Sequence, residues 1–149
     1  MGLSSASYRM IFIDTVPFIY FFEDHPQYAQ SLQNLFTEIE ISDKQIMTSL
    51  ITYTEIITRP LTQGQKRLVD KYRAYFTGSK NLSLLPFTIH VAETTAHIRS
   101  RYGFKTSDAI QIASALSFGA DCILSNDAGW KKVSEIPVFC MEDLGGEDT

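Results

Sequence analysis

The sequence contains few of the residues that build disulfide frameworks, zinc sites or membrane spans. Among its 149 residues, cysteine occurs twice and histidine three times. Cys122 and Cys140 form no C-x-x-C or similar ligand spacing, and as single residues in apolar runs they are typical of small core side chains in a reducing compartment. We interpret the histidines, His25, His90 and His97, as surface or helix-face residues rather than metal ligands. The apolar runs are too short and too interrupted to cross a bilayer.

Basic residues are also in the minority. The chain has 13 Lys and Arg against 17 Asp and Glu, which gives a formal net charge of −4. This balance argues against a domain that binds duplex nucleic acid by bulk electrostatics. It does not exclude an enzyme that acts on nucleic acid, because acidic residues gathered around a bound metal ion would be neutralised there.

Length and hydrophobic content bound the organisation of the chain. A chain of 149 residues with 44% hydrophobic residues is large enough for one domain with a substantial core. We expect a single domain over residues 1–149, with its core at about residues 10–141 and with short disordered termini, including a tail over residues 145–149. Residues 1–9 are polar and small, which predicts no secretion signal and a cytoplasmic protein.

Short apolar runs of β character alternate with helical patterns along the chain. Strands are predicted at residues 10–13, 45–48, 82–85, 122–125 and 137–141. Helices are predicted at residues 16–23, 27–39, 50–59, 62–76, 88–102, 107–118 and 129–133. Within this set, Ser49 caps a helix that ends at Arg59, before Pro60. The alternation predicts an α/β fold with a parallel sheet that is covered by helices on both sides.

Four acidic residues lie at or near the ends of these elements. Asp14 and Asp127 directly follow or nearly follow buried strands, so a parallel sheet places both at its carboxyl edge, where open α/β sheets bind ligands. Asp108 falls in the first turn of the helix that starts after Thr106. Glu55 lies inside the helix that Ser49 caps, and the isoleucines around it predict partly apolar surroundings.

Each carboxylate also has an interpretation that requires no site. Asp108 would complement a helix dipole, and Asp127 would be a turn residue beside Asn126. Glu55 would pair with Arg59 at a spacing of four residues, an interaction worth only ~0.3–0.5 kcal/mol on a helix surface. Asp14 is the most difficult to explain in this way, because the end of a buried strand is a costly place for a charge.

Taken together, the four carboxylates predict a metal site. Two unit charges ~4 Å apart repel each other by about 4 kcal/mol at an effective dielectric constant of 20, so a converging cluster needs a counter-ion. Ligand sets made only of oxygen suit Mg²⁺ or Mn²⁺. Such a site can activate a water molecule for in-line attack on a phosphodiester and stabilise the leaving oxygen.

These residues resemble the PIN domain, the nuclease fold of VapC-type toxins. The resemblance extends from about Met10 to Met141, and its order and spacing are more specific than any single segment. The segments that carry it are Phe12-Ile13-Asp14-Thr15, Pro17-Phe18-Ile19-Tyr20, the stretch Lys105 to Ala113, and Ile123-Leu124-Ser125-Asn126-Asp127. The resemblance implies a three-layer α/β/α fold with a five-stranded parallel sheet in the order 3-2-1-4-5. It also implies metal-dependent endoribonuclease activity, with RNA as the substrate, an antitoxin protein as a partner and a homodimer.

Carried over by position, the resemblance assigns catalytic and metal-binding roles to Asp14, Glu55, Asp108 and Asp127. Supporting roles fall to Thr15, Ser125 and Asn126. One departure concerns Val16, which stands two residues after Asp14 where the family often has Ser or Asn. This change removes a hydrogen bond near the metal and is expected to lower activity.

Two functional hypotheses follow from different classes. The first is an endoribonuclease that holds Mg²⁺ or Mn²⁺ and contacts phosphates through basic residues; the candidates are Lys66, Arg67, Lys71, Arg99, Arg101, Lys105, Lys131 and Lys132. The second is an interaction module with little or no catalysis, in which the aromatic segment Phe18, Tyr20, Phe21 and Phe22 forms a partner surface unless it packs in the core. A haloacid dehalogenase or a response-regulator receiver fits less well, because each requires an aspartate at a position that the sequence fills otherwise.

Overall fold

The computed structural model describes residue 3 and residues 8–145. Within that part of the chain, the strands form one five-stranded sheet in the order β3-β2-β1-β4-β5, and every neighbouring pair is parallel. The strands are β1 (Met10–Ile13), β2 (Gln45–Ser49), β3 (Leu82–Leu85), β4 (Cys122–Leu124) and β5 (Val138–Phe139). This confirms the predicted fold class and strand order. The predicted disordered tail falls mostly on residues 146–149, which lie outside the described residues.

The strand order reverses on the two sides of β1. The chain proceeds from β1 to β2 and β3 on one side, whereas β4 and β5 are added on the other. Ile13 pairs with Leu124, so β1 and β4 end side by side. The Asp14 backbone N–H extends this pairing by donating to the Leu124 carbonyl at 2.9 Å. A crevice outside the carboxyl ends of two such strands is where doubly wound sheets bind ligands.

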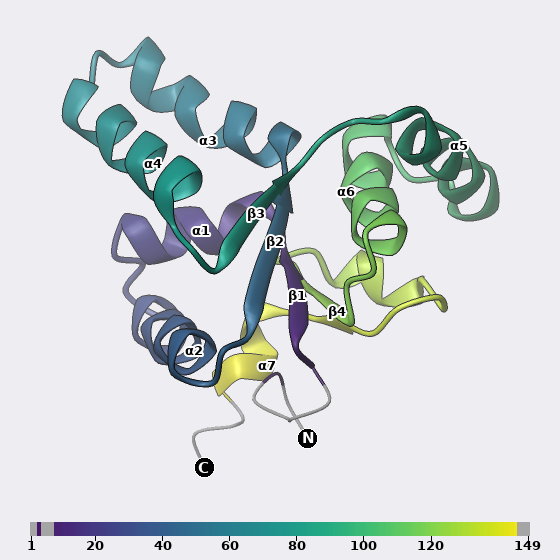
Figure 1. Ribbon diagram of the computed structural model, residues 1–149, viewed down its shortest axis with the longest axis horizontal. Helices are drawn as coiled ribbons and strands as arrows, with labels where there is room; N and C mark the ends of the chain where they lie inside the picture. Colours follow the sequence, from purple (N-terminus) through teal and green to yellow (C-terminus); the bar gives the residue numbers. More distant parts are fainter. Residues whose placement is uncertain (1–2, 4–7, 146–149) are drawn as a thin grey trace.

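Helices cover both faces of the sheet, as Figure 1 shows. On one side lie α1 (Thr15–Phe22), α2 (Ala29–Ile41), α3 (Leu50–Thr62) and α4 (Lys66–Gly78). On the other side lie α5 (Ile89–Tyr102) and α6 (Thr106–Ser117). A short 3₁₀ helix, η1 (Ala128–Lys132), follows β4, and α7 (Met141–Gly145) follows β5. The arrangement is therefore three-layered. None of the helices in the described residues is both long enough and apolar enough to cross a membrane.

The alternation of side chains along β1 divides the core into two clusters. Ile11 and Ile13 face the cluster that contains Phe18 and Phe36, and Phe12 faces the cluster around Ile112. Each cluster is apolar because a parallel strand is buried on both faces. Both cysteines, Cys122 and Cys140, are buried and free, as expected for core residues.

The aromatic segment of α1 packs largely into the first cluster. Phe18 is fully buried, and its ring stacks on Phe36 with centroids 5.9 Å apart. Phe21 and Phe22 are half-buried and meet Phe36 and Tyr72 edge to face. Core packing is thus the main use of these rings.

The boundary between α3 and α4 differs from the sequence prediction. The helix expected to stop at Arg59 continues through Pro60 to Thr62, and α4 begins at Lys66 rather than at residue 62. Pro60 has no N–H to donate to the Ile56 carbonyl, so the last turn of the helix has one hydrogen bond fewer. Gly64 then takes a positive φ of 69°, and the Gln65 N–H donates to the Pro60 carbonyl at 2.9 Å, which closes the turn.

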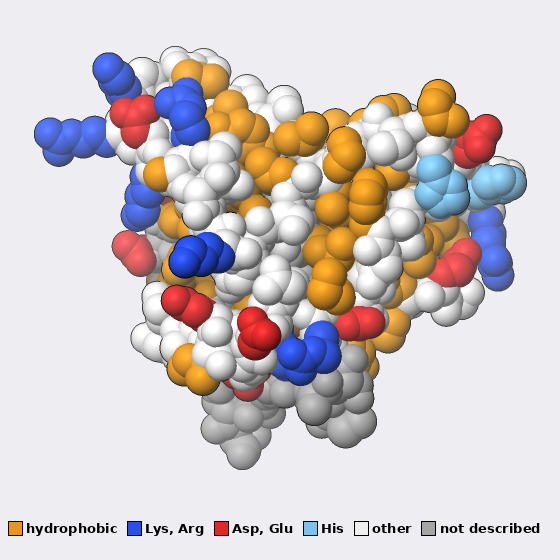
Figure 2. All heavy atoms as spheres, in the orientation of Figure 1, with side chains coloured by type: hydrophobic (Ala, Val, Ile, Leu, Met, Phe, Trp, Pro, Cys, Tyr) orange, Lys and Arg blue, Asp and Glu red, His pale blue; other side chains and the backbone are white. Residues whose placement is uncertain are grey.

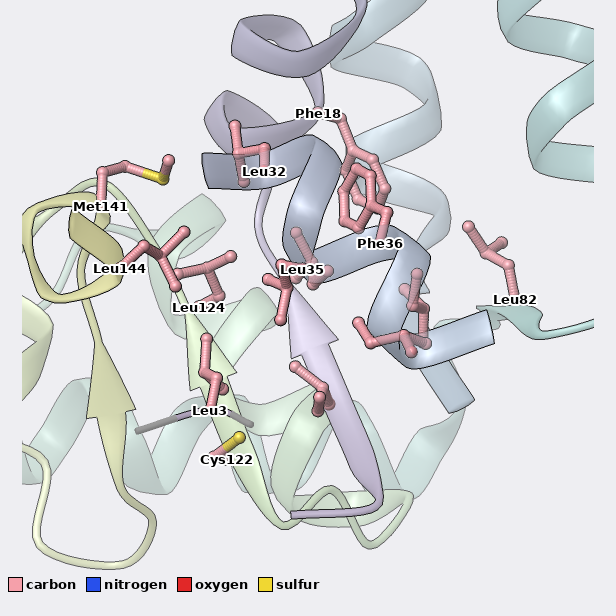
Figure 3. Close-up of a cluster of buried hydrophobic side chains, with 14 of the residues drawn as sticks. Leu3, Phe18, Leu32, Leu35, Phe36, Leu82, Cys122, Leu124, Met141 and Leu144 are labelled. Carbon is pink, nitrogen blue, oxygen red and sulfur yellow. The ribbon is translucent and has the colours of Figure 1, made fainter. Parts of the chain in front are cut away.

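The fifth strand is shorter than predicted, since Met141 begins α7 instead of ending β5. Asp143 explains the change: its carboxylate accepts a hydrogen bond from the Cys140 N–H at 2.7 Å, which caps the first turn of the helix. As Figure 3 shows, Met141 and Leu144 of α7 point toward Leu124 in the buried cluster. Their burial stabilises the helix against the sheet.

Candidate active site

The three aspartates that were predicted to form a site line one open pocket at the carboxyl edge of the sheet. Asp14 follows β1, Asp127 follows β4, and Asp108 lies in the first turn of α6. The pocket has a volume of about 390 Å³, and its lining is completed by Val16, Lys105, Asn126, Ala128 and Trp130. A larger pocket of about 530 Å³ lies beside α2 and contains none of the four predicted carboxylates. The parallel pairing of β1 and β4 is what brings Asp14 and Asp127 to the same edge.

Asp14 is half-buried, and each of its carboxylate oxygens accepts one side-chain hydrogen bond. Its Oδ1 accepts a hydrogen bond from Gln111 Nε2 at 3.0 Å, and its Oδ2 accepts one from Ser125 Oγ at 3.0 Å. Burial raises the pKa of Asp14 to about 6, because an ionised carboxylate loses hydration there. The two hydrogen bonds favour the charged form and oppose this shift without cancelling it. Asp14 therefore sits where a cation would stabilise it.

Ser125 joins the two strand ends. Its hydroxyl donates to Asp14, and it also accepts a hydrogen bond from the Asp127 backbone N–H at 3.1 Å. Asp127 is exposed, and its Oδ1 accepts from the Gly129 N–H at 2.8 Å at the start of η1. Asp127 is therefore a turn residue, as one interpretation of the sequence predicted. Because a carboxylate has about four lone-pair positions, this bond leaves Asp127 able to accept further partners.

Asp108 lies between a cation and an indole. Burial raises its pKa, Lys105 lowers it, and the negative charges of Asp127 and Glu55 raise it. The indole N–H of Trp130 points its positive end at the Asp108 side of the pocket closely enough to favour the ionised carboxylate, but within residues 8–145 it makes no hydrogen bond of good geometry. The negative charges of Asp127 and Glu55 thus both reach Asp108 and contribute to its raised pKa.

Glu55 lies beside the pocket rather than in its lining. The Thr15 hydroxyl donates to Glu55 Oε1 at 2.6 Å, and the charge of Glu55 contributes to the raised pKa of both Asp14 and Asp108. The side chain is exposed, so the partly apolar surroundings predicted for it are wrong. No ion pair between Glu55 and Arg59 occurs in the described part of the chain.

The predicted supporting residues have separate contacts. Thr15 and Ser125 are buried and hydrogen-bond to the acidic side chains, as described above. Asn126 is exposed in the pocket lining, and its Nδ2 donates to the Tyr20 hydroxyl at 3.4 Å. Val16 presents its apolar side chain to the same pocket. This position therefore supplies no hydrogen bond to a ligand.

Two residues of the site were not identified from the sequence. Trp130 is the protein's only tryptophan and is 1% exposed in the pocket wall. Gln111 is 2% exposed and contacts Asp14 directly. A signal for Gln111 was present: it stands three residues after Asp108, on a helix whose neighbouring residues are apolar, where a polar side chain must have a buried partner.

Most of the predicted phosphate-binding residues have other contacts. Lys105 alone among the eight lines the pocket. Arg101 and Lys131 pair with Glu135 and Asp143, at 3.3 and 2.9 Å. The Lys132 ammonium lies 4.6 Å from the Phe104 ring centroid, and that of Lys71 lies 5.5 Å from the Phe22 centroid. Arg99 donates to the Phe104 carbonyl at 3.2 Å.

The donor set fits a hard divalent cation. All the acidic groups that line the pocket offer oxygen, and no histidine or cysteine is among the lining residues. No three acidic, histidine or cysteine side chains of the described residues stand close enough together to enclose an ion. Mg²⁺ usually keeps several waters and takes only one or two carboxylates, so an open pocket of this kind is compatible with it.

Comparison with models of known protein families identifies the family of this chain. A family model described as the PIN domain matches residues 11–136. The chain belongs to the PIN domain family. This confirms the resemblance seen in the sequence. PIN domains are typically nucleases, so the family supports a hydrolase at the coarse level. No curated protein matches the sequence.

Solved structures of similar fold come from toxin–antitoxin systems. A chain of a toxin–antitoxin complex from Klebsiella pneumoniae has a TM-score of 0.67 at 20% identity, covering 88% of this PIN domain protein and 97% of that chain. A chain of VapBC2 from Rickettsia felis, bound to a promoter DNA fragment, has a TM-score of 0.72 at 15% identity. The match covers 88% of this protein and 98% of that chain. A chain of DNA-bound VapBC from Salmonella typhimurium has a TM-score of 0.61 at 19% identity, covering 89% and 98%. At these identities the similarity establishes the fold.

Proposed function

We propose that this PIN domain protein is an endoribonuclease of the VapC toxin type that hydrolyses RNA phosphodiesters with Mg²⁺ or Mn²⁺. The observation that carries the proposal is the meeting of Asp14, Asp108 and Asp127 in one open pocket with Lys105. Three acidic side chains from separate elements, with one cation beside them, form a surface suited to a metal ion and a phosphate.

In this proposal the aspartates hold the ion and Glu55 supports them. Asp14 is the most constrained ligand, because Gln111 and Ser125 fix both of its oxygens while leaving lone pairs free for the ion. Asp127 and Asp108 would supply further oxygens, directly or through the waters that Mg²⁺ keeps. Glu55, held by Thr15, helps bind the metal or orients the attacking water.

The pocket residues then have distinct roles in hydrolysis. When bound, the ion supplies a Lewis acid for the phosphoryl oxygen and lowers the pKa of water to within reach of neutral pH. The water oxygen would attack phosphorus in line and lose one proton to solvent, the opposite P–O bond would break, and the leaving oxygen would take up a proton from solvent. Lys105 pairs with a non-bridging phosphate oxygen and keeps the RNA backbone within reach of the carboxylates.

Cleavage of a labelled single-stranded RNA tests the proposal. Purified protein is assayed with Mn²⁺ or Mg²⁺, with excess EDTA, and as the Asp14→Asn variant. Cleavage is expected for the unmodified protein and for the control variant with the ion, and is expected to be lost with EDTA and in Asp14→Asn. Asp70→Asn is the matched control, because Asp70 is exposed on α4, pairs with Arg73 at 3.0 Å and lies outside the pocket lining. Cleavage that survives both EDTA and Asp14→Asn excludes the metal mechanism.

The second candidate is a PIN-fold interaction module with little or no catalysis. Val16 favours it, since an apolar side chain in the pocket lining removes a polar group where the family often has Ser or Asn. Calorimetry separates the two candidates. Binding of Mn²⁺ at micromolar to millimolar concentration supports the enzyme, whereas an absence of heat at millimolar Mn²⁺ favours the module.

We also propose a protein partner of the antitoxin class and a homodimer. The similar structures include toxin–antitoxin complexes. Figure 2 shows hydrophobic side chains gathered across the face between the α3–α4 hairpin and α5. In the described chain, Phe87 is 55% exposed, and Ile89, the first residue of α5, is 79% exposed. Apolar groups gathered in this way are typical of surfaces that a partner covers. Co-expression with the protein encoded beside it, followed by size-exclusion chromatography with light scattering, tests both assemblies.

A further inference from the structure

Gln111 occupies the junction between the elements that carry the acidic residues. It lies on the buried face of α6, one turn after Asp108, and it is 2% exposed. Its amide reaches across to the end of β1 and to the first turn of α3. A neutral side chain with two donors and an acceptor is buried at low cost only if all of its groups are bonded.

Every hydrogen-bonding group of this amide has a partner. Nε2 donates to Asp14 Oδ1 at 3.0 Å and to Thr52 Oγ1 at 2.7 Å. Oε1 accepts from the hydroxyl of Ser49, which also accepts from the Thr52 N–H as the N-cap of α3. Ser49 has one hydroxyl proton and gives it to Oε1, so the amide is oriented with its N–H groups toward Asp14. The flipped amide would place its oxygen against a carboxylate.

The same contacts continue to Glu55. The Thr52 and Thr15 hydroxyls are 3.2 Å apart, and Thr15 donates to Glu55 Oε1 at 2.6 Å. Thr15 and Thr52 are both buried, at 8% and 0% exposure. Water therefore does not compete for the contact between Thr52 and Thr15, and the chain from Gln111 to Thr15 has few alternative arrangements. Glu55, at the end of this chain, is exposed.

We propose that Gln111 is a positioning residue that orients Asp14, and through Thr52 and Thr15 also Glu55, for divalent-ion binding. The inference rests on the proposed metal site and adds a residue that acts on the ion only through the carboxylates. Partners of this kind fix the direction of a ligand's lone pairs, and their loss typically lowers metal affinity about 10- to 100-fold. The uncharged amide achieves this without adding a charge that would compete with the ion.

Two variants test the proposal by Mn²⁺ binding rather than by activity. Gln111→Met keeps the length of the side chain and removes all three polar contacts. Gln111→Asn keeps an uncharged amide but shortens the side chain by one methylene, so that it no longer reaches Asp14, and it is the second variant if the Met variant does not fold. Dissociation constants for Mn²⁺ are measured by calorimetry and by electron paramagnetic resonance of free Mn²⁺. Circular dichroism and thermal melting of the metal-free proteins confirm that each variant is folded.

The matched control is Ser114→Ala. Ser114 lies one turn further along α6, is 1% exposed, and donates only to the Ile110 carbonyl at 2.7 Å. We expect Mn²⁺ affinity about 10- to 100-fold weaker in the Gln111 variants and unchanged in the control. Folded Gln111 variants that bind Mn²⁺ as tightly as the unmodified protein overturn the positioning role and leave the proposed nuclease intact. An unmodified protein that binds no Mn²⁺ overturns the proposed function itself.

Discussion

Ser125 and Asp14 are linked by a hydrogen bond of 3.0 Å from the serine hydroxyl to the aspartate Oδ2, across the ends of two neighbouring parallel strands. The same hydroxyl accepts from the Asp127 N–H at 3.1 Å. One buried oxygen thereby fixes the carboxylate that ends β1 and the turn that carries the next carboxylate. The Ser125 hydroxyl contacts both the Asp14 carboxylate after β1 and the backbone of Asp127 after β4, so it helps to set the distance between these two aspartates.

Ser125→Ala is expected to destabilise the protein by about 1–3 kcal/mol, since it leaves one oxygen of a half-buried carboxylate and one backbone N–H without a partner. Urea unfolding at pH 7 in EDTA measures the change. Ser117→Ala is the matched control, because the Ser117 hydroxyl is buried without a hydrogen-bond partner in the described chain and its loss is expected to be neutral or slightly stabilising. Equal effects of the two substitutions would contradict the role of Ser125.

The raised pKa of Asp14 predicts a pH-dependent stability. Its pKa rises from 3.8 to about 6 on folding, so in this window the folded protein binds more protons than the unfolded chain. Stability therefore declines as the pH rises from about 4 through 6. Asp14→Asn removes the titrating group, so its free energy of unfolding is expected to lack the decline of up to about 3 kcal/mol between pH 4 and 7. The substitution also replaces one acceptor oxygen by an NH2 group that faces a donor, Gln111 or Ser125, and this cost does not depend on pH.

Denaturant unfolding at pH 4, 5, 6 and 7, in EDTA so that no ion stabilises Asp14, measures this effect. The exposed Asp70→Asn variant again serves as the control. An Asp14→Asn protein whose free energy of unfolding declines between pH 4 and 7 as much as that of the unmodified protein would show that burial does not penalise the charge. The prediction also separates stability from activity, because the same substitution is expected to abolish cleavage.

Trp130 offers a direct optical signal from the pocket. It is the only tryptophan, it lines the pocket beside Asp108, and its indole N–H has no acceptor in the described chain. A paramagnetic ion bound among the aspartates is expected to quench its emission. The measurement is a Mn²⁺ titration of intrinsic fluorescence excited at a wavelength selective for tryptophan. EDTA should restore the emission, and Asp108→Asn should weaken the apparent affinity. Emission that does not respond to saturating Mn²⁺ would place the ion elsewhere.

Lys105 is expected to contribute one phosphate contact. Lys105→Gln should weaken binding of a single-stranded oligonucleotide and reduce the slope of log K against log salt by about 0.7. Fluorescence anisotropy over a range of salt concentrations, with EDTA present to prevent cleavage, gives the slope. Lys66→Gln is the control, because Lys66 is exposed on α4 and does not line the active-site pocket. An unchanged slope for Lys105→Gln would remove it from the RNA path.

The sequence predicted the elements well where the local pattern is strong. The run from Met10 to Ile13 is the central strand as predicted, and the helix before Gly103 ends where a glycine with a φ of 77° takes over. The predicted bounds of a strand or helix were wrong where contacts with residues distant in the sequence determine where the element ends. Met141 and Leu144 form a helix because the Asp143 cap and the apolar cluster stabilise it, and no short window shows that cluster.

By itself the sequence determined the alternation of strands and helices and the residues that end them, because hydrophobic periodicity and helix caps act within a few positions. It thereby identified Asp14, Asp108 and Asp127 as residues at element ends. Only the tertiary structure decided which of these ends meet, and that Gln111, 97 residues from Asp14 in the chain, holds its carboxylate. Hydrogen bonds between buried groups depend on distance in space, and strand pairing sets that distance.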